Sequence, residues 1–510
     1  MPLGRTWSAA FVGAVGKTVT VEANVGPGLP GIYLVGLGDT AVREARDRIK
    51  TAAKNTGLQW PKTKVIVSLS PGDLPKSGSH FDLPVCLAVL AASREVDPAP
   101  LERTMVLGEL GLDGSVGQVA GCLPAILTAA QEGATRVIIP EGNAGEASVV
   151  DALPVHPVRH LSEVIAWLAG EAPLPSIVPS VARAVEHARH TLDFADVAGQ
   201  DQARFAAEVA AAGSHHFMMI GPPGSGKSMI AERIPSILPR LTGAECLEAT
   251  SVHSVAGKGF RGPVIEPPFV APHHSVTSAA LLGGGAGRPR PGVVSLAHCG
   301  VLFLDEVSEI PARILDGLRV PLEEGQVRLA RSRSTTVYPA RFQLILAANP
   351  CRCGAEEPVR CRCSAGERRR YLSNLTGPMR DRLDFVVRTQ AREAVLSGDA
   401  EPSAPIAGRV AAARERSLAR WSVPNAAMPA PIIRREYPAE ESAMALIGAV
   451  LGEGGVSQRG ADRVLKVAWT LCDLDGAPRP SIDHVGRALE LRGADFGLVD
   501  RLHLNQGEVA

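Results

Sequence analysis

The 510-residue sequence lacks a long hydrophobic run, an excess of charge of either sign, and any tandem repeat or low-complexity tract. Its longest apolar stretches, such as Val85–Ala92, are far shorter than the ~18 residues that a membrane-spanning helix needs. The N-terminal apolar run follows a single early arginine, Arg5, and is broken by glycines, which is atypical of a secretory signal peptide. We therefore expect a cytoplasmic protein with no membrane partner.

Net charge gives no argument for a nucleic-acid partner, because 53 Lys and Arg residues balance 53 Asp and Glu residues. Any surface that binds nucleic acid must then be local. The nine cysteines do not predict a disulfide framework, since cytoplasmic chains keep their thiols reduced. The length is sufficient for about three domains.

The most informative stretch begins with an apolar run, Phe217–Ile220, that leads into a glycine-rich segment. A strand, a glycine-rich turn and a helix start, in this order, are typical of the loop that binds the phosphates of a nucleoside triphosphate. Glycine permits the tight turn that points backbone N–H groups at phosphate oxygens, and the following helix adds its positive dipole end. The phosphate loop comprises Gly221, Pro222, Pro223, Gly224, Ser225, Gly226, Lys227 and Ser228.

Two side chains of the phosphate loop and two later carboxylates predict an ATP hydrolase. Lys227 is expected to reach the β- and γ-phosphates and Ser228 to bind Mg²⁺. A second apolar run ends in Asp305 and Glu306, of which the first would bind Mg²⁺ and the second would polarise the attacking water. The alternative is a glycine turn followed by an unrelated acidic strand end.

Three further residues fit the same chemistry. Asn349 ends an apolar strand, where its amide can reach the γ-phosphate or the lytic water. Arg382 belongs to a Gly-Pro-x-x-Asp-Arg motif and suits an arginine that reaches the ATP of a neighbouring subunit. Arg459 opens a later helix and is a candidate lid arginine that contacts the γ-phosphate. The alternative for Arg382 is a surface salt bridge with Asp381 or Asp384.

The chain divides into blocks of different pattern. Alternating strands and helices around the ATP motifs predict an α/β domain with a parallel sheet, and the C-terminal block reads as helices separated by Gly and Pro turns. The expected parts are a first domain at 1–168, a proline-rich linker at 169–192, the nucleotide domain at 193–390, a connecting helical segment at 391–424 and a helical lid at 425–510. Expected strands are 17–23, 64–69 and 137–140, and expected helices are 41–55, 119–132, 406–421, 440–451, 460–473 and 482–491.

The order of these motifs resembles that of AAA+ ATPases, and in particular of the magnesium-chelatase-like YifB/ComM family. The resemblance also rests on segments 269–275, 283–285, 291–298 and 349–351, on the N-terminal segments 28–30, 35–37, 39–44, 73–76 and 81–84, and on 463–470. It implies a hexameric ring that uses ATP and Mg²⁺ to move on single-stranded or branched DNA without sequence preference. Helicase or branch-migration activity in recombination or transformation is the implied role.

The N-terminal block is similar to the Lon-protease fold at 108–109 and 131–140. Proteolysis by that fold needs a serine nucleophile that a lysine activates. The corresponding positions hold His80 and Leu123, which cannot do this, and the nearby Ser79 and Lys76 are more typical of solvated turn residues. We expect a non-proteolytic scaffold or partner-binding domain.

An arginine-rich segment after the acidic pair predicts a β-hairpin. Residues 326–341 alternate on both sides of a Ser-Arg-Ser turn, as hairpin strands do. Arg328, Arg331 and Arg333 lie at or around its tip, and hairpins of related AAA+ proteins point into the ring channel. There they would bind phosphates without reading bases. The alternative is an edge hairpin with solvated arginines.

Two groups of metal-binding residue types remain. Cys351, Cys353, Cys361 and Cys363 supply the four thiolates of a structural zinc site, although each Cys-x-Cys pair is tighter than the usual spacing. A redox-sensitive pair or unligated thiols are the alternatives, and the nearby arginines, including 368–370, make this segment a second candidate DNA contact. Adjacent His273 and His274 favour a structural or pore-facing loop over a metal site.

Two other functions stay open. One is a magnesium-chelatase motor subunit that drives metal insertion into a porphyrin held by a partner. The Lon-like block and the lack of an Asp-x-Ser-x-Ser motif argue against it. The other is a protein-remodelling AAA+ chaperone that recruits clients through its N-terminal block.

Overall fold

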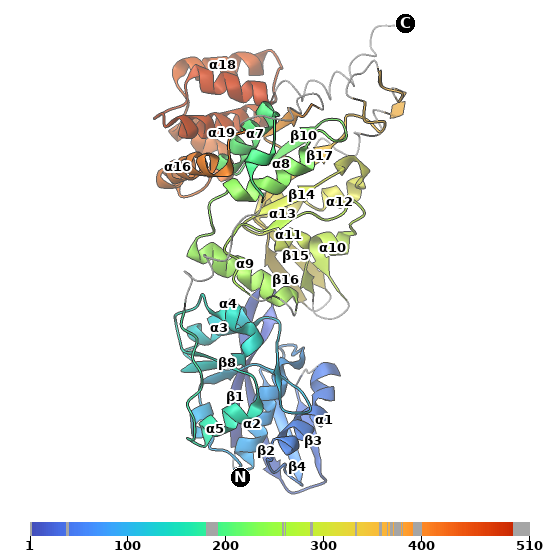
Figure 1. Cartoon of the computed structure of the whole chain (residues 1–510), viewed down its shortest axis with the longest axis vertical. Coiled ribbons are helices and arrows are strands. Elements are labelled where there is room, and N and C mark those ends of the chain that lie inside the picture. Colours follow the sequence, from blue (N-terminus) through green and yellow to red (C-terminus); the bar gives the residue numbers. More distant parts are fainter. Residues whose placement is uncertain are drawn as a thin grey trace.

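The chain folds into three parts that follow one another along its long axis (Figure 1): an N-terminal sheet domain, a central domain with a parallel sheet, and a helical part at the opposite end. This computed structural model describes residues 3–36, 40–179, 192–257, 260, 262–285, 289–331, 334–355, 360–364, 366–367, 371, 379, 381–390 and 400–492. Among these residues, no helix is long and apolar enough to cross a bilayer.

The N-terminal domain is built on a mixed sheet with strand order β3-β4-β2-β1-β5-β8-β9. The pairs β1–β2 and β2–β4 are antiparallel and the other pairs are parallel. The strands are β1 (Leu3–Val12), β2 (Val15–Gly26), β3 (Gly31–Val35), β4 (Lys64–Ser70), β5 (Thr104–Val106), β8 (Arg136–Pro140) and β9 (Val155–Val158), beside the small pair β6 (Glu109–Leu110) and β7 (Val116–Gly117). The expected strands correspond to β2, β4 and β8.

The helices of this domain cover the sheet and fill its core. Helix α2 is buried along its whole length because almost every side chain in it is apolar, and it packs on β1 and β2. The helices are α1 (Thr40–Asn55), α2 (Asp82–Ala92), α3 (Cys122–Gln131), α4 (Ala144–Ala147) and α5 (Leu161–Leu168). Helix α3 begins later than the expected 119, since Gly121 precedes it in the left-handed conformation.

The central domain contains a sheet in the order β11-β14-β17-β10-β18, and all four strand pairs are parallel. Its strands are β10 (Phe217–Ile220), β11 (Phe269–Val270), β14 (Val301–Leu304), β17 (Gln343–Ala348) and β18 (Phe385–Arg388). Every residue of β10, β14 and β17 is buried, as near-continuous apolar runs of a parallel sheet are. The predicted parallel α/β sheet is confirmed.

Helices and a hairpin surround this sheet. The helices are α7 (Asp201–Gly213), α8 (Lys227–Arg233), α9 (Gly243–Ala256), α10 (Ser278–Leu282), α11 (Val293–Leu296), α12 (Ala312–Asp316) and α13 (Arg319–Glu324). The predicted hairpin is present as β15 (Gln326–Arg331) and β16 (Ser334–Pro339), with Arg331 opposite Ser334. A short ladder joins β12 (Gly283–Gly284) and β13 (Arg290–Pro291).

The C-terminal part is helical, as predicted. It contains α16 (Ser403–Trp421), α17 (Ala430–Glu436), α18 (Glu441–Gly452), α19 (Gln458–Asp475) and a helix at residues 482–492. Helix α16, expected only to connect two parts, packs against α7 and α19. Its buried Ile406, Val410 and Ala413 belong to the same apolar core as the sheet residues Phe217 and Phe385. The lid therefore shares a core with the central domain.

The N-terminal domain contacts the central domain through α3 and α9 (Figure 1). The Gly121 amide donates to Ser254 O at 2.8 Å, and Gln118 Nε2 donates to Phe260 O at 2.6 Å. The β1–β2 turn also touches the hairpin, because a Cβ added at Gly13 would lie 2.2 Å from Val337 O. The hairpin strand β16 thus lies against the N-terminal domain.

Candidate active site

The phosphate loop connects β10 to α8 and packs tightly on the end of β18. A Cβ added at Gly221 would lie 2.0 Å from Thr389 Oγ1, so only glycine fits there. Ser225 Oγ and Thr389 Oγ1 are 2.6 Å apart and share a hydrogen bond. Thr389, which the sequence analysis did not single out, therefore fixes the path of the loop.

Lys227 points back into its own loop. Its Nζ donates to Gly221 O at 2.8 Å and Pro222 O at 2.9 Å, and lies 3.1 Å from Asn349 Oδ1. Burial lowers the pKa of Lys227, and Asp305 and Glu306 partly oppose this shift. Strand β10 leads into the loop with Lys227 and its neighbour β17 ends before Asn349, so the parallel sheet brings the two side chains together.

Ser228 and Asp305 form the pair expected for Mg²⁺. Ser228 Oγ donates to Asp305 Oδ2 at 2.6 Å, and Asp305 Oδ1 accepts from the Glu306 backbone N–H at 2.7 Å. A hydroxyl and a carboxylate oxygen are the hard ligands that Mg²⁺ prefers. The donor set therefore fits this cation.

Glu306 has an unusual backbone and an unexpected partner. Its φ is 47°, a left-handed conformation that is uncommon outside glycine and is concentrated at functional sites. Its Oε2 lies 2.9 Å from His274 Nδ1, and both side chains are partly exposed. The ring of His273 packs on His274 with centroids 4.0 Å apart. His274 thus contacts the expected catalytic carboxylate and His273 packs behind it, an arrangement that no sequence motif indicated.

Arg382 and Arg459 form ion pairs at the junction between the central domain and the lid. Arg382 pairs with Glu323 of α13, so the predicted alternative partners, Asp381 and Asp384, are wrong. Asp384 is buried and instead pairs with Arg463. Arg459 NH1 lies 3.4 Å from Asp381 Oδ2. Residues 377, 378 and 380 of this motif lie outside the described residues.

The hairpin carries exposed arginines on β15. Arg328 NH2 lies 2.8 Å from Glu324 Oε2, and Arg331 donates to Gly285 O. Both side chains lie on the surface. The third predicted DNA contact, Arg333, lies outside the described residues, as does the basic run 368–370.

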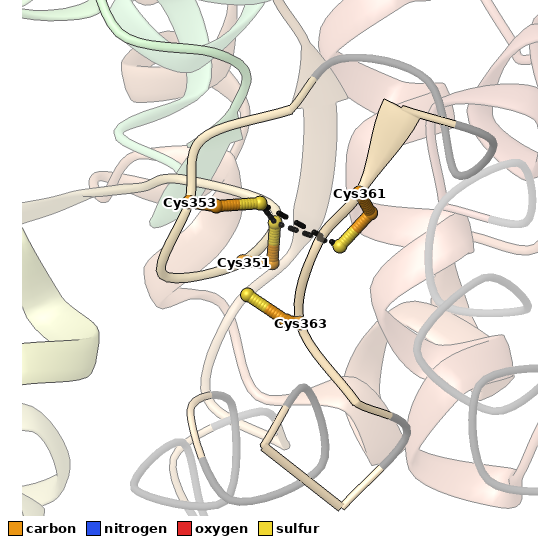
Figure 2. Close-up of side chains that lie close together, drawn as sticks. All are labelled: Cys351, Cys353, Cys361 and Cys363. Carbon is orange, nitrogen blue, oxygen red and sulfur yellow. Dashed lines mark hydrogen bonds between the residues drawn. The ribbon is translucent and has the colours of Figure 1, made fainter.

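The four clustered cysteines converge in space (Figure 2). Cys351 Sγ lies 3.3 Å from Cys353 Sγ and 3.4 Å from Cys361 Sγ, and the last two are 3.6 Å apart. With Cys363, all four sulfur atoms lie within 4.8 Å of one another. Four thiolates around one zinc ion at the usual Zn–S distance are about 3.8 Å apart. The arrangement fits a tetrahedral zinc site.

This cysteine cluster abuts the ATP motifs. Cys351 follows Asn349 by two residues. A Cβ added at Gly354 would lie 2.6 Å from Pro223 Cδ of the phosphate loop. The chain that follows Cys353 therefore packs directly against the phosphate loop.

A second group, Glu248, His298 and Cys299, has the spacing of metal ligands but a different explanation. The Arg341 backbone N–H donates to His298 Nδ1 at 3.0 Å. The neutral ring therefore has its proton on Nε2, which lies 3.0 Å from Glu248 Oε2. Since both ring nitrogens are engaged, this group is a hydrogen-bonded network.

Three family models match successive parts of the chain. They are described as "Subunit ChlI of Mg-chelatase" at residues 21–143, "Magnesium chelatase, subunit ChlI" at 193–395 and "Magnesium chelatase, subunit ChlI C-terminal" at 400–492. Protein YifB of Escherichia coli is 39% identical over 98% of this chain and 99% of its own length. The chain belongs to the magnesium-chelatase-like YifB/ComM family.

Other relatives agree with this assignment. An uncharacterized protein of Mycobacterium tuberculosis is 47% identical over 96% of this chain and 99% of its own length. Competence protein ComM of Haemophilus influenzae is 37% identical over 96% of this chain and 98% of its own length. A Lon protease of Brevibacillus choshinensis is 28% identical over 175 residues, which are 32% of this chain. The Lon-like similarity of the N-terminal domain is therefore shown as well.

In this YifB/ComM-family chain, the positions that correspond to the Lon dyad have other contacts. His80 Nε2 lies 2.8 Å from Ala9 O, and Leu123 is fully buried. Nearby, the Ser79 hydroxyl donates to Glu109 and Lys76 Nζ donates to Pro71 O. The serine and the lysine thus have separate partners, and a non-proteolytic role remains the prediction. The expectation of a solvated Lys76 is wrong, because its side chain is buried.

Proposed function

We propose that this chain is the subunit of a ring-forming, ATP-driven motor that moves on DNA in the cytoplasm. The observation that carries the proposal is the set of hydrogen bonds that joins Lys227 to Asn349 and Ser228 to Asp305. These bonds bring together, at one edge of the parallel sheet, the lysine expected to bind phosphate, the serine and aspartate expected to bind Mg²⁺, and the asparagine expected to contact the γ-phosphate or the water. Membership of the YifB/ComM family supports the DNA-directed role.

Each residue has a distinct part in hydrolysis. Lys227 holds the β- and γ-phosphates, and Glu306 orients the attacking water and accepts its proton. Asn349 fixes the γ-phosphate or the water. Ser228 and Asp305 would hold Mg²⁺, which neutralises phosphate charge when it is bound.

Two arginines act on the γ-phosphate, and one of them makes the reaction depend on assembly. Arg382 completes the ATP site of the neighbouring subunit, and Arg459 of the lid reaches the γ-phosphate in its own subunit. Both sit in ion pairs with partly exposed carboxylates, those of Glu323 and Asp381, which they can leave for phosphate. In a closed ring, which we take to be a hexamer, every ATP site receives an Arg382 from the neighbouring subunit.

The other functions of this fold predict different activators. A DNA motor is stimulated by single-stranded, duplex or forked DNA. A magnesium-chelatase subunit responds to a porphyrin and its carrier, and a chaperone responds to an unfolded protein. We expect the ATPase rate to rise with DNA and to stay at its basal value with the other two. A rise with porphyrin or protein alone would overturn the DNA assignment.

Arg331 and Arg333 are expected to grip the DNA backbone. Replacing both with Ala should weaken binding equally on unrelated DNA sequences, because phosphate contacts carry no sequence information. A plot of the logarithm of the DNA association constant against the logarithm of the salt concentration should become shallower by about one to two units of slope for each pair of arginines that contacts DNA in the ring. Basal ATPase without DNA should survive.

A matched control removes the same charge elsewhere. Arg5 and Arg159 lie on the surface of the N-terminal domain, and their double Ala variant should bind DNA as the parent does. If the Arg331/Arg333 variant also binds and moves DNA normally, the hairpin is not the grip. The basic segment 360–370 then becomes the next candidate.

The cysteine cluster should hold one structural zinc ion per chain. Elemental analysis of protein purified without chelators should find about one zinc per chain, and the Cys351/Cys353 double Ser variant should lose both the zinc and folding stability. The Cys246/Cys299 double Ser variant, whose thiols lie outside the cluster, should keep its zinc. Metal-free parent protein would leave a redox or packing role for these thiols.

A further inference from the structure

Three arginines of the lid contact residues 381–384, the short segment that carries Arg382 and is called the Arg382 segment below. Arg459 pairs with Asp381 on one side of Arg382, and Arg463 pairs with Asp384 on the other. Arg459 and Arg463 lie one helical turn apart at the start of α19, so they face the same way. Arg492 NH1 donates to Leu383 O at 3.1 Å and to Asp384 O at 2.8 Å.

The Asp384 contact is the buried centre of this arrangement. Its side chain is 1% exposed, and it accepts from the His216 backbone N–H at 2.9 Å and lies 3.2 Å from His215 Nδ1. Burial raises the pKa of Asp384, but Arg463 and then His215 outweigh it and hold the pKa well below its usual range. Breaking a buried ion pair by removing one partner is strongly unfavourable.

The contacts of Arg382 and Arg459 differ from this buried contact. The Arg459 side chain is 76% exposed, whereas Arg382 is 11% exposed and only its partner Glu323, at 63%, faces solvent. An exposed ion pair contributes little, so Arg459 can leave Asp381 for another partner. The Arg463–Asp384 pair has no such freedom. The segment is therefore held from two sides, by Arg463 and Arg492 of the lid and by the Asp384 N–H bond to His216 O at 2.7 Å.

We infer that Arg463 is a positioning residue, which acts through Asp384 to tie Arg382 to the lid of its own subunit. Because Asp384 is also hydrogen-bonded to the His216 backbone just before β10, the Arg463–Asp384 pair fixes Arg382 between the lid and the central sheet. The lid of one subunit thereby helps to orient the arginine that the next subunit uses. This inference rests on the proposed ring with Arg382 acting in trans.

The test uses mixed rings. Arg463→Met removes the charge at similar volume, and it should keep ATP binding while hydrolysis falls about 10- to 100-fold, as for a displaced catalytic group. Mixing it with Lys227→Ala subunits should restore part of the rate, because those subunits bind no ATP but present an intact Arg382. Arg463→Lys should retain part of the parent rate.

Controls separate this role from general damage to the lid. Glu306→Gln, which disables a subunit's own site, should not be rescued by Lys227→Ala. Arg487→Met removes another lid arginine, one whose partner is Asp475, and it should hydrolyse ATP at the parent rate. Should Arg463→Met fail to fold, Arg492→Gln removes the carbonyl contacts of the same segment and should show the same rescue.

The outcomes are distinguishable. Two results would overturn the positioning role alone. One is hydrolysis by Arg463→Met at the parent rate. The other is a lost rate that Lys227→Ala subunits do not restore, although the same subunits restore the rate of Arg382→Ala. Absence of rescue for Arg382→Ala would instead overturn the trans arrangement on which the inference rests. Rescue of both variants supports the inference.

Discussion

Glu306→Gln should bind ATP as tightly as the parent and hydrolyse it at least ~100-fold more slowly, because loss of one positioned acid–base group lowers the rate by roughly 10²–10⁴-fold. The substitution keeps the size and shape of the side chain but removes its charge and its ability to take a proton from water. Lys227, Ser228 and Asp305 are untouched, so the phosphate and metal contacts remain. Nucleotide binding and steady-state phosphate release measure the two effects separately.

A neighbouring carboxylate supplies the control for Glu306. Glu309 is exposed three residues further along the chain, and Glu309→Gln should hydrolyse ATP at close to the parent rate. Near-normal turnover by Glu306→Gln would show that another group activates the water. His274, which contacts Glu306, would then be the first residue to test.

Arg382→Ala should retain ATP binding and lose hydrolysis by about 10³-fold or more, the range of an arginine that acts from a neighbouring subunit. The arginine stabilises charge on the transferring phosphoryl group without holding the ground-state nucleotide. In mixtures with Lys227→Ala, some interfaces combine an intact ATP site with an intact arginine, and activity should return in part.

A surface arginine from the adjacent helix is the matched control. Arg319, at the start of α13, is exposed, and Arg319→Ala should leave the rate unchanged. No rescue of Arg382→Ala at any mixing ratio, together with a monomeric protein in the presence of ATP, would contradict the proposed ring.

The central sheet and the convergence of the ATP motifs at its edge were predictable because their signals are local. Apolar runs such as Val301–Leu304 are long enough to define buried strands, and polar residues directly follow them. In a parallel sheet, neighbouring strands end at the same edge, so Lys227 and Asn349 had to meet. Short-range sequence pattern together with one rule of topology was sufficient.

Other contacts depend on the tertiary path and carried no local signal. His274 reaches Glu306 only because β11 pairs beside β14, and nothing in the histidine pair itself indicates this. The alternative partners of Arg382 were wrong since sequence proximity does not show that Asp384 points inward to Arg463. The contact of Gly354 with Pro223 joins residues far apart in sequence.

ATP-dependent movement on DNA is the central claim, and migration of a mobile four-way DNA junction measures it most directly. The parent protein with ATP and Mg²⁺ should move the branch point to the end of the arms and so separate the junction into two DNA duplexes. Glu306→Gln should bind the same junction in the presence of ATP and convert none of it. Absence of conversion by an ATP-hydrolysing parent, or equal conversion by Glu306→Gln, would contradict an ATP-driven DNA motor.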